Sequence, residues 1–297
     1  MTSLHPSNFL RFKDYKSILS KNNNINLYRG CTHGCIYCDS RSECYGMNHP
    51  FEEIEVKSNA LELLEKTLYK KKHKCMIASG AMSDPYITLE KELQHTRKSL
   101  EIIEKYSFGA TVLTKSDLIL RDLDVLQRIN QKTRTVVQMT LTTYDENLCR
   151  IIEPNVCTTQ KRFAVLKEMQ KAGIPTVVWL TPILPFINDN EENITGLLEY
   201  CQEAKIKGLL SFGAGMTLRN GNREYYYQKL DEHYPGLKQQ YIRRFGSSYG
   251  IKSPHSGKLT AIIKKFCDAN NIIYGTKDVF EYCALFPQQK HQLSLFD

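Results

Sequence analysis

The sequence has no run of 18 apolar residues, and only one of its 297 residues is tryptophan. Because a membrane-spanning helix needs about 20 apolar residues, we expect no transmembrane segment. No apolar stretch precedes a cleavage site near the first residue, so we expect no secretory leader and a protein of the cytoplasm. Internal repeats and low-complexity linkers are also missing, which favours one large α/β domain with a C-terminal extension.

Regularly spaced cysteines that would build a disulfide framework are missing as well. The chain has 10 cysteines at irregular positions, and a domain of this length needs no covalent cross-links to be stable. Six of them lie mostly in apolar or helical contexts and are expected to be small buried hydrophobic residues. These six are Cys75, Cys149, Cys157, Cys201, Cys267 and Cys283.

Three other cysteines form a close group. Cys31, Cys35 and Cys38 follow the pattern C-x3-C-x2-C. Three thiolates can hold three irons of a [4Fe–4S] cluster and leave the fourth iron open to another ligand, whereas electron-transfer clusters are usually closed by four cysteines. A zinc site with Cys44 or His33 as fourth ligand is the alternative, but zinc ligands usually come as two C-x2-C pairs.

Strand and helix patterns alternate along the first 215 residues. Expected strands cover residues 25–28, 75–79, 110–114, 135–141, 176–180 and 208–212. Expected helices cover residues 59–70, 89–106, 118–130, 159–172 and 191–204. Six strand–helix units predict an α/β fold with a parallel sheet, too few for a closed eight-stranded barrel. The cysteine group follows the first strand, at the edge of the sheet where catalytic residues gather.

Polar residues follow the expected strands at that same edge. They are Ser83 and Asp84 after the second strand, Lys115 after the third, Thr140 and Thr142 at the fourth, and Asn188 after the fifth. A lysine there can pair with a carboxylate, and threonine and asparagine can hydrogen-bond to a ribose or a base. Each residue has a cap or turn role as its alternative, and for Thr142 the two roles are balanced.

The cysteine spacing, with Tyr37 directly before the third cysteine, resembles that of the radical SAM superfamily. Over residues 25–215, the segments after the strands resemble the spore photoproduct lyase-like branch of that superfamily. The resemblance implies a (β/α)6 partial barrel, a [4Fe–4S] cluster on the three cysteines, and S-adenosyl-L-methionine at the open iron. It also implies that one electron, from a donor such as flavodoxin or ferredoxin, cleaves S-adenosylmethionine to a 5′-deoxyadenosyl radical that abstracts a hydrogen atom.

Within that branch, the Ser-Asp segment and the lysine after the next strand lie near S-adenosylmethionine. The resemblance therefore implies the same place for Ser83, Asp84 and Lys115. One position departs from the pattern, because the lyase has a catalytic cysteine two residues before Ser-Asp and this chain has Ala81. Alanine cannot return a hydrogen atom to a substrate, so Tyr86 is the first candidate for that role. The departure also leaves open a different lesion or base as substrate.

The segment 237–266 contains no acidic residue. Its basic residues are Lys238, Arg243, Arg244, Lys252, Lys258, Lys264 and Lys265, and its interleaved aromatic residues include Tyr241, Phe245 and Tyr249. Basic side chains neutralise phosphates, and aromatic faces stack on unpaired bases. Together with the net charge of +8, this pattern favours a nucleic acid as partner. The alternative is a solvated helix face with aromatic residues packed under the barrel.

The last residues resemble the short peptide by which bacterial DNA polymerases and repair proteins dock on the sliding clamp. The matching residues are Gln292, Leu293, Ser294, Leu295 and Phe296. Their apolar side chains suit an apolar pocket on a partner, and the alternative is that they pack back onto the barrel. We thus expect three parts: a barrel over 1–220, a basic, aromatic-rich and mainly α-helical extension over 221–286, and a flexible tail over 287–297.

Three functions compete on these grounds. The leading one is a radical SAM enzyme that repairs damaged pyrimidines in DNA, which requires bases taken out of the helical stack. The second keeps this chemistry but modifies RNA. The third is a non-catalytic iron–sulfur protein that binds DNA and the clamp. The clamp-like peptide favours DNA over RNA, and we expect a monomer.

Overall fold

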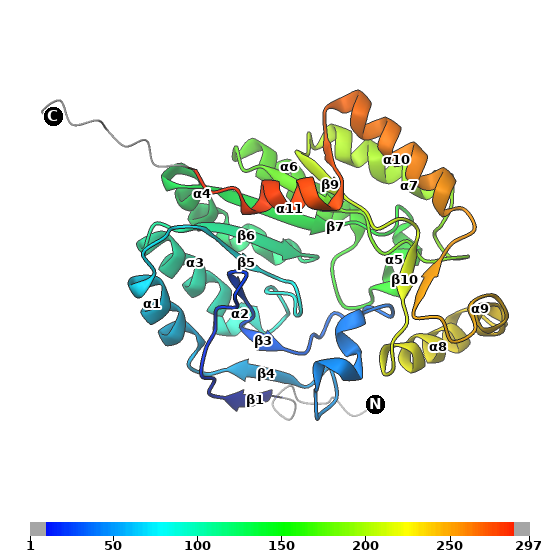
Figure 1. Cartoon of the computed structure of the whole chain (residues 1–297), viewed down its shortest axis with the longest axis horizontal. Coiled ribbons are helices and arrows are strands. Elements are labelled where there is room, and N and C mark those ends of the chain that lie inside the picture. Colours follow the sequence, from blue (N-terminus) through cyan, green and yellow to red (C-terminus); the bar gives the residue numbers. More distant parts are fainter. Residues whose placement is uncertain (1–9, 288–297) are drawn as a thin grey trace, which may run out of the picture.

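A seven-stranded parallel sheet forms the centre of the fold (Figure 1). The computed structural model describes residues 10–287. In spatial order the strands are β12 (Ile273–Tyr274), β9 (Gly208–Leu210), β8 (Thr176–Trp179), β7 (Thr135–Thr140), β6 (Gly109–Thr114), β5 (Met76–Ser79) and β2 (Asn24–Ile25). All neighbouring pairs are parallel. The sheet is open, with β12 and β2 at its two edges.

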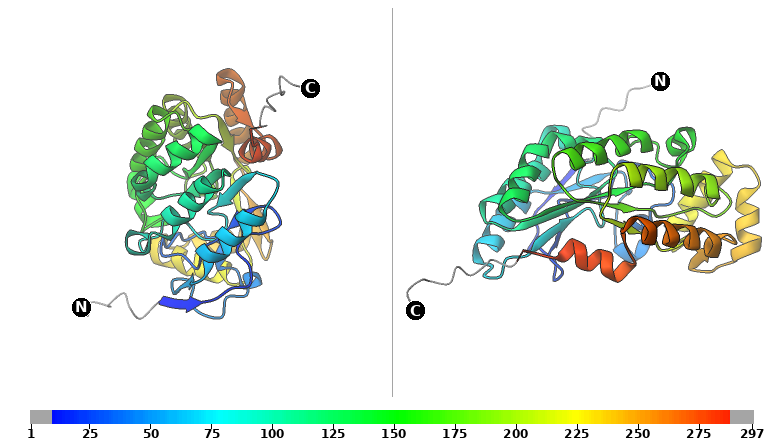
Figure 2. Two further views of the ribbon diagram at one scale, coloured as in Figure 1. Left: turned by 90° about the vertical axis from the view of Figure 1, so that its left-hand side faces the viewer. Right: turned by 90° about the horizontal axis from the view of Figure 1, so that it is seen from above.

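The inner strands bury both of their faces, as strands of parallel sheets usually do. Val137 and Val178 belong to the larger core, on the face covered by helices, while Val136 and Val177 pack with residues of α11 (Thr276–Ala284) on the other face. Neighbouring side chains point to opposite faces because a strand has a period of two. The helices that cover the first face include α1 (Ala60–Lys70), α3 (His95–Lys105), α4 (Leu123–Lys132), α6 (Thr159–Lys171) and α7 (Glu191–Glu203) (Figure 2).

The predicted α/β fold with six parallel strand–helix units is confirmed, with differences at the first strand. The predicted strand at 25–28 is divided in two. Its beginning is β2 in the large sheet, and its end is β3 (Tyr28–Arg29), which pairs antiparallel with β4 (Ile54–Lys57). β1 (Leu10–Lys13) lies parallel to β4 and completes a small three-stranded sheet.

The predicted helix at 89–106 is interrupted at Gln94. This residue has a φ of 53°, which a right-handed helix cannot accommodate. The short helix α2 (Glu90–Leu93) therefore ends there, and α3 begins at the next residue. Nothing in the apolar pattern marks this break, because the buried side chains keep helical spacing on both sides of it.

The chain after β9 builds a separate wall and then returns to the sheet. β10 (Gly215–Thr217) pairs antiparallel with β11 (Gly250–Lys252), and the helices α8 (Asn222–His233) and α9 (Leu237–Phe245) lie between them in the sequence. After β11, α10 (Ser256–Asn270) leads into β12, the seventh strand of the large sheet. The C-terminal extension is thus joined to the barrel through β12.

The aromatic residues of the extension divide into buried and exposed ones. Tyr226 and Tyr241 are buried, and their hydroxyl oxygens lie 2.8 Å apart. Tyr249 is 52% exposed, and Arg243 and Arg244 are exposed. The alternative of aromatic side chains packed inside the fold thus applies to the two buried tyrosines, and the basic side chains face solvent.

Within residues 10–287, no helix has the length and apolar character needed to cross a bilayer. The clamp-like residues Gln292–Phe296 lie outside the described part of the chain. Docking on a sliding clamp therefore stays a prediction from the sequence.

Candidate active site

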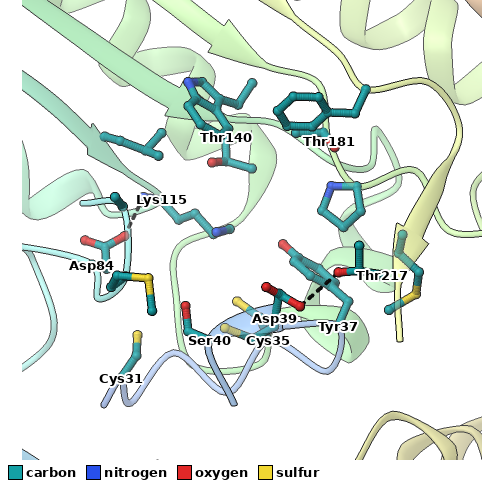
Figure 3. A pocket seen from close by; sticks show the side chains of 18 of the residues that line it. Cys31, Cys35, Tyr37, Asp39, Ser40, Asp84, Lys115, Thr140, Thr181 and Thr217 are labelled. Carbon is teal, nitrogen blue, oxygen red and sulfur yellow. Dashed lines mark hydrogen bonds between the residues drawn. The ribbon is translucent and has the colours of Figure 1, made fainter. Parts of the chain in front are cut away.

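A cavity of about 740 Å³ opens at the carboxyl ends of the parallel strands (Figure 3). One part of its wall comes from the loops after β3, β5, β6 and β8 and from the end of β7. The other part comes from the loop after β9 and from the paired strands β10 and β11. Parallel α/β sheets hold their ligands at this edge, and the volume is typical of a small-molecule site.

The three cysteines reach the cavity on the loop that follows β3. Cys31, at its start, donates its backbone N–H to the carbonyl oxygen of Phe51 at 3.1 Å. The preceding residue, Gly30, has a φ of 84°, and a Cβ there would lie 2.5 Å from that same oxygen. Only glycine fits this position, which fixes the direction in which the loop leaves the strand. All three thiols are free and line the cavity.

The donor set fits a cluster better than a single metal ion. Within residues 10–287, no three His, Cys, Asp or Glu side chains are placed to hold one ion. Zinc needs four ligands on one ion, so the zinc alternative finds no support. Of its two candidate fourth ligands, Cys44 is exposed and accepts a hydrogen bond from Arg219, while His33 faces Asp84. Separate thiols around one cavity suit a group with several irons, each bound by one thiolate.

The electrostatic environment differs among the three thiols. Burial raises the pKa of Cys35 and of Cys38. Burial acts in the same direction on Cys31, but the charge of the neighbouring His33 outweighs it and lowers the pKa of this thiol. Burial acts to lower the pKa of His33, and Cys31 and Asp84 outweigh it and raise the pKa to about 9. Cys31 is thus the thiol that becomes a thiolate most readily, which is the form that binds iron.

Asp84 joins the ends of β5 and β6. Its Oδ1 accepts a hydrogen bond from Thr114 Oγ1 at 2.7 Å, and its Oδ2 accepts one from the backbone N–H of Lys115 at 2.8 Å. Ser83 lies beside it and donates from Oγ to the carbonyl oxygen of Gly30 at 2.6 Å. Both residues line the cavity, but their polar atoms fix the loops around it.

Lys115 points its ammonium group into the cavity, near Thr140 at the end of the neighbouring strand β7 (Figure 3). Its Nζ lies 5.9 Å from the centre of the Tyr37 ring and forms no ion pair with any described carboxylate. Burial acts to lower the pKa of Lys115, but the negative charges of Cys35, Glu153 and Asp84 outweigh it and raise the pKa. The group is therefore a fixed positive charge without a direct partner, suited to an anionic ligand.

Three predicted site residues do not reach the cavity. Asn188 donates from its side-chain amide to the carbonyl oxygen of Thr142 at 2.7 Å, and both residues are completely buried. They tie the loop after β8 to the end of β7, which corrects their predicted contact with the ribose or adenine. Tyr86 is also buried and lines a second hollow, which shares only His33 with the cavity. Tyr86 thus lies outside the lining of the cavity, and its role as hydrogen donor stays a prediction from the sequence.

A hydrogen bond that the sequence did not indicate lies on the side of the cavity that β10 and β11 line. Thr217 of β10 donates from Oγ1 to Oδ1 of Asp39 at 2.9 Å (Figure 3). Asp39 directly follows the third cysteine, so this bond ties the cysteine loop to β10, which pairs with β11 of the C-terminal extension. At Gly215, a Cβ would lie 2.1 Å from the carbonyl oxygen of Ile251, so β10 needs glycine at this position to pair closely with β11.

A buried ion pair supports the same loop from the other side. Arg162 Nη2 lies 2.6 Å from Glu153 Oε2, and both side chains are fully buried. The hydroxyl of Tyr37 donates to Glu153, and Arg162 donates to the carbonyl oxygen of Thr140 at 3.2 Å. Burial acts to raise the pKa of Glu153, but the Arg162 charge outweighs it and lowers the pKa. The pair thus stays ionised and connects the cysteine loop with β7.

Comparison with known families identifies this arrangement. Residues 25–198 match the model of the radical SAM superfamily, a span that includes the cysteine loop and strands β5 to β8. The chain belongs to the radical SAM superfamily. This membership confirms the two predicted cofactors, a [4Fe–4S] cluster and S-adenosylmethionine.

Two sequences similar to this chain belong to uncharacterised proteins. One from Methanocaldococcus jannaschii is 34% identical over 170 residues, which are 56% of this chain and 62% of that protein. One from Mycobacterium tuberculosis is 28% identical over 223 residues, which are 73% of this chain and 65% of that protein. The chain thus spans less than two thirds of the length of these two relatives.

Solved structures of spore photoproduct lyase share the fold. One, in complex with a dinucleoside spore photoproduct, has a TM-score of 0.61 at 15% identity, over 89% of this chain and 81% of the lyase. Another, a variant of the lyase with bound S-adenosylmethionine and the same photoproduct, has a TM-score of 0.60 at 16% identity over the same shares. The radical SAM partial barrel predicted from the sequence is confirmed by this likeness.

Proposed function

We propose that this radical SAM enzyme acts on nucleic acid, and on damaged pyrimidines in DNA in particular. The observation that carries the proposal is a single cavity in which the three thiols and Lys115 face a wall from the basic extension. That wall ends in Lys252, within a stretch of 30 residues that contains seven basic and no acidic side chains. The fold shared with spore photoproduct lyase, whose structure holds a dinucleoside photoproduct, supports the same substrate class.

The cavity residues divide into two groups in this proposal. Cys31, Cys35 and Cys38 hold the cluster, and Lys115 pairs with the carboxylate of the methionyl group. Thr140, at the end of the neighbouring strand β7, lines the same cavity and offers its hydroxyl to the ribose. When bound, the cofactors supply a 5′-deoxyadenosyl radical, which removes a hydrogen atom only from a carbon in direct contact with it.

The return of a hydrogen atom to the substrate must differ from that of the lyase. Ala81 and Met82 line the cavity where the lyase pattern has its cysteine, and neither has an S–H or O–H group. Among the described residues, the only thiols in the cavity wall are the three of the cluster loop. We therefore propose a substrate within the pyrimidine class that is not confined to the spore photoproduct.

The test uses anaerobically reconstituted protein, S-adenosylmethionine, a reductant and ultraviolet-irradiated DNA. Mass spectrometry follows 5′-deoxyadenosine and each pyrimidine photoproduct, with unirradiated DNA as the control. We expect 5′-deoxyadenosine to form together with the loss of at least one photoproduct. Cleavage of the cofactor with every photoproduct intact would reject DNA repair and direct the same assay to RNA. A loaded cluster that cleaves no cofactor would instead support a non-catalytic DNA-binding protein.

The clamp-like tail belongs to the proposal as a docking peptide for DNA replication and repair sites. Removing residues 292–297 is expected to abolish binding to a bacterial sliding clamp, because the apolar anchors are lost, and to leave 5′-deoxyadenosine formation unchanged. Surface plasmon resonance with immobilised clamp measures the first effect. Leu295→Ala should reproduce the loss and Ser294→Ala should not. Undiminished clamp binding by the truncated chain would refute the docking role.

A further inference from the structure

Three aromatic rings meet at the end of β8, where this strand borders the cavity. Trp179 lies with its ring centre 6.2 Å from that of Phe212 and 6.0 Å from that of Phe280, and both pairs are close to perpendicular. Trp179 and Phe212 line the cavity, and Phe280 belongs to α11. We call these three residues the aromatic corner. None of the roles assigned above uses it.

Hydrogen bonds across three adjacent strands fix the tryptophan. Its Nε1–H donates to Gln138 Oε1 at 2.7 Å, and Gln138 Nε2 donates to Thr111 Oγ1 at 2.9 Å. Val177, two residues before Trp179, lies on the same face of β8 and packs in the buried cluster that includes residues of α11. The indole ring therefore stands on a packed layer with its polar atom already satisfied, so its orientation is set before any ligand arrives.

The rings of Phe212 and Phe280 are exposed to solvent. Phe212 is 57% exposed and Phe280 is 43% exposed, although both contact Trp179, which packs against a buried apolar cluster. Packing alone would favour covering such large apolar rings, and contiguous exposed apolar groups mark binding surfaces. Lys252 lines the same cavity and contributes a positive charge to its wall. An apolar, planar surface beside a positive charge matches a base attached to a phosphate backbone.

We propose that the aromatic corner receives an unpaired base of the nucleic acid substrate by stacking. This inference rests on the proposed function and adds the residues that hold the base. The adenine of S-adenosylmethionine has the same planar chemistry. We assign the corner to the substrate because Phe212 lines the cavity while Phe280 lies outside its lining, and both rings are exposed to solvent, from which a polymer can reach them.

The single tryptophan makes the proposal directly measurable, because its emission reports on the corner itself. The reconstituted full-length protein is titrated anaerobically with a single-stranded thymidine hexanucleotide, with an abasic oligomer of equal length, and with S-adenosylmethionine alone. We expect the hexanucleotide to change the Trp179 emission and the abasic oligomer to leave it unchanged. Phe212→Ala should weaken hexanucleotide binding about tenfold, because stacking contributes strongly per base. Phe12→Ala, which removes a ring 61% exposed on β1, is the matched control and should change nothing.

Fluorescence anisotropy of a labelled hexanucleotide measures binding independently of the tryptophan. Hexanucleotide binding that neither alters the emission nor responds to Phe212→Ala would overturn the aromatic corner and leave the proposed function standing. An emission change produced by S-adenosylmethionine, with none added by the hexanucleotide, would assign the corner to the cofactor and also overturn the proposal. If anisotropy shows no binding of any oligonucleotide, nucleic acid is rejected as the substrate class. The assignment of an unpaired base to the aromatic corner is then rejected as well.

Discussion

Cys38→Ala is expected to abolish turnover altogether, because it removes one of the three thiolates that hold the cluster and no replacement lies nearby. Cys44, the closest free cysteine in sequence after it, is exposed and bonded to Arg219. Without the cluster no electron reaches S-adenosylmethionine, so the effect is loss and not reduction of rate. Iron and sulfide content, visible absorption and 5′-deoxyadenosine formation measure it on one anaerobic preparation.

Cys44→Ala is the matched control for this prediction. It removes a thiol from the same region but from outside the cavity, so cluster content and turnover should remain those of the native chain. Circular dichroism of both variants shows whether the fold is kept. Turnover by Cys38→Ala with an empty site would reject the assignment of the three cysteines, and cluster loss in Cys44→Ala would show a fourth ligand.

Arg162→Leu is expected to lower the free energy of unfolding by about 3–5 kcal/mol, because it leaves the Glu153 carboxylate buried without its counter-charge. The arginine also donates to the carbonyl oxygens of Thr140 and Cys157, at 3.2 and 2.9 Å, and these acceptors lose their partner as well. Urea unfolding followed by circular dichroism measures the change. The double variant with Arg162→Leu and Glu153→Leu should recover part of the lost free energy of unfolding, since removing both charges costs less than leaving one buried charge unpaired.

The pH dependence of stability follows from the same pair. Arg162 lowers the pKa of Glu153 in the folded protein against the opposing effect of burial. A lowered carboxyl pKa contributes stability that is fully present above the unfolded value of about 4.3 and is lost as the pH falls through the folded value. Acid should therefore destabilise the native chain more than the double variant. An equal acid dependence in both would show that Glu153 does not titrate with unfolding.

The periodic parts of the fold were predictable from the sequence. Strands such as β7 and β8 are buried almost throughout because helices cover one face and α11 covers part of the other. β12 was not predictable, since it has only two residues and exists through its pairing with β9. The break at Gln94 was missed for a similar reason, as the burial pattern continues across it.

The candidate site was partly predictable because strand ends converge at one edge of a parallel sheet. Ser83, Asp84, Lys115 and Thr140, which this rule selected, line one cavity in the structure, and their contact with the cofactor stays a prediction. It failed for Thr142, where residue order alone does not tell which way a side chain points beyond the end of a strand.

Long-range pairs could not be read from the sequence at all. Asp39 and Thr217 are 178 residues apart, and their hydrogen bond depends on how the extension folds back over the cysteine loop. Trp179 was hidden for a different reason, because it stands in an apolar strand and looks like one more core residue. Its place in the cavity depends on where α11 stops covering the sheet.

The unjoined edges of the sheet affect what kind of molecule can be treated. In a ring of strands closed on itself, a long polymer reaches the centre only by threading an end or by extruding one unit from above. Here β2 and β12 do not pair with each other, so the wall of strands is interrupted along its length. If the proposed function holds, a nucleic acid need not thread a free end through a closed ring of strands. We then expect covalently closed circular DNA to be as acceptable a substrate as short fragments.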